Sequence, residues 1–120
     1  MRTYSQDAAL PISASGNNTV SLGDLLSLHG AAPVFFQITG TFSASYVAEV
    51  SVDGATWVDA SQVLYDVSTG NVMTSPITAP VILFANAPLP RMRFRCSAFT
   101  SASTTVPPRV HVMGQDSRSV

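Results

Sequence analysis

Three stretches of the chain alternate between apolar and polar residues with a period of two, which is typical of strands that bury one face. In residues 91–99 the even-numbered positions through Ala98 are apolar, and the odd-numbered positions through Ser97 are polar. Residues 45–52 and 109–113 follow the same pattern. No segment shows a convincing helical period.

The spacing of these stretches and of the turn residues between them predicts about eight short strands. We expect them at 19–22, 34–39, 45–52, 56–63, 71–74, 81–84, 91–99 and 109–113. Glycine, proline and an Asp-Gly pair separate them. Many short strands at near-regular spacing predict an all-β fold, an antiparallel β-sandwich of jelly-roll-like type.

The domain limits follow from composition. Residues 18–114 are expected to form the sandwich, residues 1–17 an extended N-terminal arm, and residues 115–120 a short polar tail. The single candidate helical turn lies at residues 23–28 and is short.

A tight hairpin is predicted after residue 52, where Asp53-Gly54 supplies the positive φ that such connections need. The pattern places Val52 on the inward side of the preceding strand. Trp57 is expected to anchor the start of the returning strand in the core.

Charge is unusually sparse in this chain of 120 residues. Charged residues make up 11% of it, lysine is absent, and the formal net charge is -1, whereas an ordinary domain is about 25% charged. Interface cores are depleted in charge, so this composition favours a structural subunit whose surface is covered by other copies or by another protein. The alternative is a compact domain with a neutral surface rich in serine and threonine.

The same composition argues against several kinds of chemistry. The single cysteine, Cys96, excludes an internal disulfide and is expected to be a buried hydrophobe. Acidic residues are too dispersed for a calcium loop, and His29 and His111 lack ligands or catalytic partners at a useful spacing. We therefore expect no metal, no cofactor and no catalytic site, and hence no enzyme.

No apolar stretch suits a signal peptide or a membrane span. The near-neutral charge balance argues against a general nucleic-acid binder. We expect synthesis in a cytoplasm, with neither a membrane nor a nucleic acid as partner.

Arg91, Arg93 and Arg95 are half of all basic residues and share one strand face. Arginine pairs bidentately with carboxylates and tolerates burial at interfaces. These three residues, the arginine stripe, could dock acidic residues of a neighbouring subunit. They could equally form a solvent face paired with Glu49 or Asp59.

Five large apolar residues fall outside the inward pattern. If several of them form one patch, that patch is a candidate interface; alternatively the second sheet covers them. They are Phe35, Phe42, Tyr65, Phe99 and Met113.

Three sequence motifs carry a family resemblance. The segments FQITGTF (36–42), VSVDGATWV (50–58) and RMRFRCSAFTS (91–101) occur in this order. Together they resemble small β-sandwich structural proteins of tailed-bacteriophage virions, which serve as head decoration (cement) proteins, head fibres or tail-tip components. The resemblance spans about residues 34–113.

This resemblance implies a capsid decoration protein that stabilises the shell by bridging capsomers and is located in the virion. It implies a homo-oligomer, with a trimer favoured, bound to the major capsid protein or to another virion protein. The expected contacts are the arginine stripe and the N-terminal arm with Arg2 and Tyr4. A tail, neck or head-fibre subunit remains an alternative.

The hairpin and the later arginine strand also resemble discoidin-type carbohydrate- or lipid-binding domains. A carbohydrate-binding module predicts exposed aromatic and polar side chains that converge in a loop pocket. The missing cysteine pair and the missing signal weigh against a secreted lectin.

Overall fold

The structure is a computed structural model, and it describes residues 2–15, 18–24, 34–60, 63–73, 76–85 and 91–116. At residues 2–4, 23–24 and 115–116 it describes the backbone alone.

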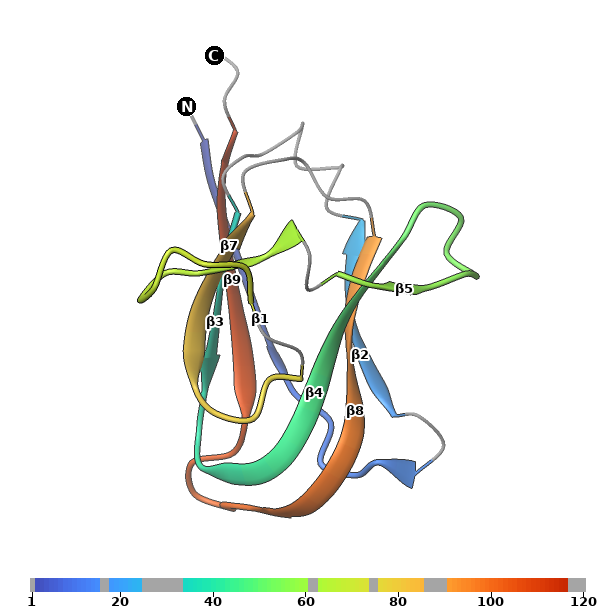
Figure 1. The fold of residues 1–120 in the computed structure, drawn as a ribbon, viewed down its shortest axis with the longest axis vertical. Helices are drawn as coiled ribbons and strands as arrows, with labels where there is room; N and C mark the ends of the chain where they lie inside the picture. Colours follow the sequence, from blue (N-terminus) through green and yellow to red (C-terminus); the bar gives the residue numbers. More distant parts are fainter. Residues whose placement is uncertain are drawn as a thin grey trace.

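Within the described residues, nine strands form two antiparallel sheets. The two sheets pack face to face (Figure 1). The five-stranded sheet has the order β1 (Arg2–Ala9), β9 (Arg109–Asp116), β3 (Val34–Thr39), β7 (Val81–Ala85) and β6 (Tyr65–Asp66). The four-stranded sheet has the order β2 (Thr19–Asp24), β8 (Arg91–Ala102), β4 (Phe42–Ser51) and β5 (Val58–Asp59). The predicted all-β sandwich is confirmed.

The N-terminal segment belongs to the sandwich rather than to a separate arm. Strand β1 pairs with β9 along its whole length, from Arg2 opposite Asp116 to Ala9 opposite Arg109. Gln115 and Asp116, expected in a polar tail, continue β9. Alternation is weak in residues 2–9, and this is why the sequence did not reveal an edge strand there.

Two predicted strands are shorter in the structure. Strand β5 has two residues, because residues 52–56 are bent into the turn that precedes it. Residues 71–74 contribute an isolated bridge, Val72 to Tyr65. The predicted helical turn at 23–28 begins as strand, since Gly23 and Asp24 belong to β2, and its remaining residues lie outside the described part.

Irregular pairing between β4 and β8 reverses the side-chain alternation near the start of β4 and the end of β8. The register passes from Tyr46 opposite Cys96 to Ser45 opposite Ala98, which leaves Ser97 as an extra residue. Ala98, expected to face inward, is therefore exposed, whereas Phe99 packs against the core. Such bulges bend strands, and both strands curve strongly at this end in Figure 1.

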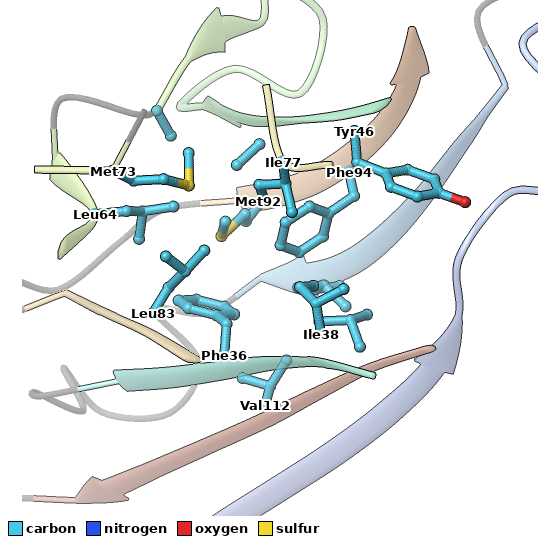
Figure 2. Close-up of a cluster of buried hydrophobic side chains, with 14 of the residues drawn as sticks. Phe36, Ile38, Tyr46, Leu64, Met73, Ile77, Leu83, Met92, Phe94 and Val112 are labelled. Atoms are coloured by element: carbon cyan, nitrogen blue, oxygen red, sulfur yellow. The ribbon is translucent and has the colours of Figure 1, made fainter. Parts of the chain in front are cut away.

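The core lies between the sheets and takes side chains from both (Figure 2). Phe36 of the five-stranded sheet meets Phe94 of the other edge-on, with ring centroids 6.3 Å apart. Tyr46 is fully buried, and its hydroxyl donates a hydrogen bond of 2.7 Å to the Pro11 carbonyl. Desolvation raises the pKa of Tyr46 to about 12. Cys96 is buried in this core, as expected.

Candidate interaction surfaces

The arginine stripe lies on the outer face of the four-stranded sheet, where Glu49 of β4 stands opposite Arg93 of β8. Arg93 Nε donates to Glu49 Oε1 at 2.9 Å, and Arg95 Nε donates to Glu49 Oε2 at 3.3 Å. The two guanidinium groups cover Glu49, which is only 8% exposed. Two of the three arginines are thus paired within the chain.

Trp57 lies against this stripe and outside the core. The guanidinium carbon of Arg93 sits 4.2 Å from the centroid of the indole, a cation–π contact. Trp57 is half-buried, so the prediction that it anchors the core is wrong. Strand β5 begins with Val58 opposite Val50, and alternation from Val58 places Trp57 on the outer face.

The predicted turn at Asp53-Gly54 is present, and the Asp53 carboxylate organises it. Asp53 Oδ1 accepts hydrogen bonds from the amides of Ala55 and Thr56, both at 2.8 Å, and from the Ser51 hydroxyl at 2.9 Å. The amide of Thr56, that of Ala55 and the Ser51 hydroxyl lower the pKa of Asp53 from 3.8 to about 2. Gly54 has a φ of 79°.

Arg91, the third member of the stripe, is committed to this turn. Its Nη1 donates to the Val52 carbonyl at 2.6 Å, and its side chain passes Gly54. Val52, expected to point inward, is 81% exposed because β4 ends at Ser51 and Val52 begins the turn.

Arg2 and Tyr4, the other predicted contact residues, have backbones in β1 at the edge of the five-stranded sheet. Tyr4 stands opposite Gly114 of β9. The side chains of both residues lie outside the described part of the structure.

The outer face of the five-stranded sheet carries a line of large apolar side chains that crosses four strands. The register aligns Met113 of β9 with Phe35 of β3, then with Phe84 of β7 and Tyr65 of β6. The Phe84 ring lies 6.1 Å from that of Phe35 and 5.4 Å from that of Tyr65, measured between centroids. We call these four residues the aromatic row.

Three of the five residues outside the inward pattern therefore meet in one patch: Phe35, Tyr65 and Met113. Phe42 and Phe99 instead pack against the core, because the β4–β8 irregularities turn them inward. The sequence did not reveal Phe84 and Ile82 as members of the outer face. Every residue of β7 is apolar, so alternation could not separate its two sides.

A polar row runs beside the aromatic row, two residues along on β9 and β3 and continuing onto β1. It comprises Asp7 of β1, His111 of β9 and Gln37 of β3, which the register aligns. Asp7 Oδ2 lies 3.4 Å from Arg109 Nη2 and 3.7 Å from His111 Nδ1. His111, predicted as an outward polar residue, does face outward, and its Nε2 lies 3.3 Å from Thr39 Oγ1.

Between the two rows the face is hollowed into a shallow groove of about 640 Å³. Its walls combine the apolar side chains of Phe35, Ile82 and Met113 with the polar side chains of Asp7 and His111. Ile82 is 42% exposed and Met113 46%. Because several exposed apolar side chains adjoin one another here, the groove is a candidate interaction surface.

Within the described ranges, no group of three or more histidine, cysteine, aspartate or glutamate residues could hold a metal ion. The same part of the chain contains no helix of the length and apolarity that crossing a bilayer requires.

Comparison with known proteins gives one structural likeness. No protein-family description and no curated protein matches the sequence. The crystal structure of the SPBc2 prophage-derived protein YomS is similar in fold, with a TM-score of 0.62 over 95% of each chain and 9% sequence identity. At this identity the likeness concerns the fold, and it extends over nearly the whole of both chains.

Proposed function

We propose that this protein is a structural protein of a bacteriophage virion, and specifically a capsid decoration (cement) protein. The observation that carries the proposal is the shared fold with a prophage-derived protein over 95% of both chains. The sparse charge of the chain supports it, because a surface with few charges is suited to contact with other subunits.

A decoration protein of this kind acts through thermodynamics. It binds across neighbouring capsomers, a site that exists only on the assembled shell, so its binding energy stabilises the shell relative to free subunits. Repeated contacts around a symmetry axis add avidity to individually weak interfaces. Its partners are further copies of itself and the major capsid protein.

The arginine stripe is proposed as the electrostatic contact with this partner. Arg93 and Arg95 share Glu49 as their carboxylate, and an arginine presents five N–H donors. Each guanidinium therefore retains donors for an acidic residue of a neighbouring protein. Glu49 fixes the positions of the two side chains before binding, which reduces the entropy lost on contact.

Sedimentation with shells tests the cement role. The protein is mixed with capsids assembled without it, and we expect it to pellet with them and to raise the temperature at which they open. Failure to pellet with any shell, together with recovery from the tail fraction of purified virions, would assign it to a tail or neck position instead.

Arg91→Gln tests the stripe, with Val106→Gln as the control, because Val106 is 53% exposed in a loop away from it. We expect Arg91→Gln to weaken shell binding several-fold at low salt and less at high salt, since salt screens exposed charges. Equal binding by both variants at low salt would remove Arg91 from the contact.

A further inference from the structure

The two outer faces of the sandwich differ in how many charged side chains they present. The four-stranded sheet presents three arginines together with Glu49 and Asp59. Across β1, β9, β3 and β7, the charged side chains described on the outer face of the other sheet are Asp7 and Arg109, which pair at 3.4 Å. These two charges cancel, and the aromatic row makes the face largely apolar.

This face carries a shallow groove, and two copies of it together present about the 1,000 Å² that a specific protein interface needs as a minimum. The strands of this sheet have 8, 8, 6, 5 and 2 residues. At about 3.4 Å per residue and about 4.8 Å between strands they outline an area of roughly 500 Å². A standard interface buries about 800 Å² on each partner. Sheets pack face to face through interdigitating apolar side chains at about 10 Å separation, as the two sheets of this molecule already do.

The polar groups on this face suit a second copy of the same face. Because its two charged groups, Asp7 and Arg109, pair with each other, the face has no net charge that would select an acidic or basic partner or repel its own copy. Gln37 lies on β3, the central strand of the sheet, and its exposed side chain makes no hydrogen bond within the described part of the chain. A carboxamide carries both donor and acceptor, so two copies of Gln37 related by a two-fold axis satisfy each other.

We propose that the outer face of the five-stranded sheet packs against the same face of a second copy, forming a two-fold dimer with Gln37 near its axis. The contact is isologous, because the same patch is used by both copies. Apolar side chains on the rim of the groove, such as Met113, pack into the groove of the partner. This inference rests on the proposed function, which calls for a homo-oligomer. The inference makes that oligomer a dimer in place of the expected trimer.

Charge insertion into this face tests the dimer, using the full chain and light scattering coupled to size exclusion. Ile82→Glu and Met113→Glu each place an unpaired carboxylate in the proposed contact, where its desolvation opposes association. We expect both variants to be monomers at concentrations where the wild type is a dimer. Val58→Glu is the matched control: Val58 is 57% exposed on β5 of the other sheet, and this variant should remain a dimer.

A cross-link locates the axis independently of any loss of stability. The one natural cysteine is buried at 1% exposure, so an added surface cysteine reacts alone. Gln37→Cys should give a covalent dimer under mild oxidation, seen on a non-reducing gel. Val58→Cys at the same concentration should remain largely uncoupled.

The outcomes separate this inference from the proposed function. A wild type that stays monomeric up to high concentration, an oligomer that both glutamate variants leave intact, or a trimer would overturn the dimer. If circular dichroism shows both glutamate variants unfolded, the Gln37→Cys cross-link decides. A dimer that fails to pellet with shells removes the cement role alone, whereas a monomer that pellets removes the dimer alone.

Discussion

At the scale of single residues, Glu49 is the one buried carboxylate among the described residues. It is 8% exposed and pairs with two guanidinium groups. Glu49→Gln leaves both of them without their charged partner, so we expect a loss of about 1.5–3 kcal/mol in the free energy of unfolding. Urea denaturation measures it as a lower midpoint at unchanged slope.

Asp7→Asn is the control for that substitution, because Asp7 also pairs with an arginine, Arg109, but its side chain is 57% exposed. Exposed ion pairs contribute less than about 1 kcal/mol. Equal losses in the two variants would contradict the importance of burial at Glu49.

Asp53 makes the free energy of unfolding depend on pH in the acidic range. Its folded pKa is about 2 against an ordinary value of 3.8, so the stabilisation is fully present above pH 4 and disappears as the pH falls toward 2. Asp66, whose pKa the Ser68 hydroxyl and amide also lower, contributes in the same direction. We expect Asp53→Asn to show a shallower loss of stability between pH 4 and pH 2 than the wild type, in urea titrations at each pH. If stability falls equally steeply with pH in both proteins, the Asp53 carboxylate does not contribute to the acid sensitivity.

At the scale of elements, the turn between β3 and β4 depends on Gly40. Its φ is 109°, and a Cβ there would overlap the backbone of Pro107. Thr41 and Val106 join the same two segments by a backbone hydrogen bond of 2.9 Å. We expect Gly40→Ala to lower the free energy of unfolding by more than about 2 kcal/mol, because a strained backbone and a steric clash combine.

Gly70→Ala separates these two causes. Gly70 also has a positive φ, 73°, but a Cβ there would meet no atom within 4 Å. Gly70→Ala should lower the free energy of unfolding by about 1 kcal/mol, because alanine is disfavoured in the left-handed conformation even without a clash. Thermal melts of the two variants compare the costs, and equal shifts would mean that contact with Pro107 is relieved without penalty.

Elements also mark the limit of what the sequence predicts. Strand β3 was predicted with the observed bounds because turns flank it and its run is β-branched and aromatic. The outward place of Phe35 was predicted too, but the aromatic row was not, because it depends on which strands are neighbours. Alternation assigns a residue to one face of its strand. The strand order β9-β3-β7-β6 decides which of these residues become neighbours on the sheet. Bulges such as that at Ser97 reverse alternation without a sequence signal, and so Ala98 and Phe99 were assigned to the wrong sides.

At the scale of the whole molecule, both sheets share one core cluster, so they should unfold together. The single tryptophan, Trp57, reports on the outer face of the four-stranded sheet, while circular dichroism reports on all strands. The unfolding transitions followed by tryptophan fluorescence and by circular dichroism should therefore coincide in urea. If the dimer forms, their common midpoint should also rise with protein concentration, because association stabilises the folded state by mass action. Ile82→Glu should abolish this concentration dependence and leave the coincidence intact, since it acts on the contact between copies and not on the core.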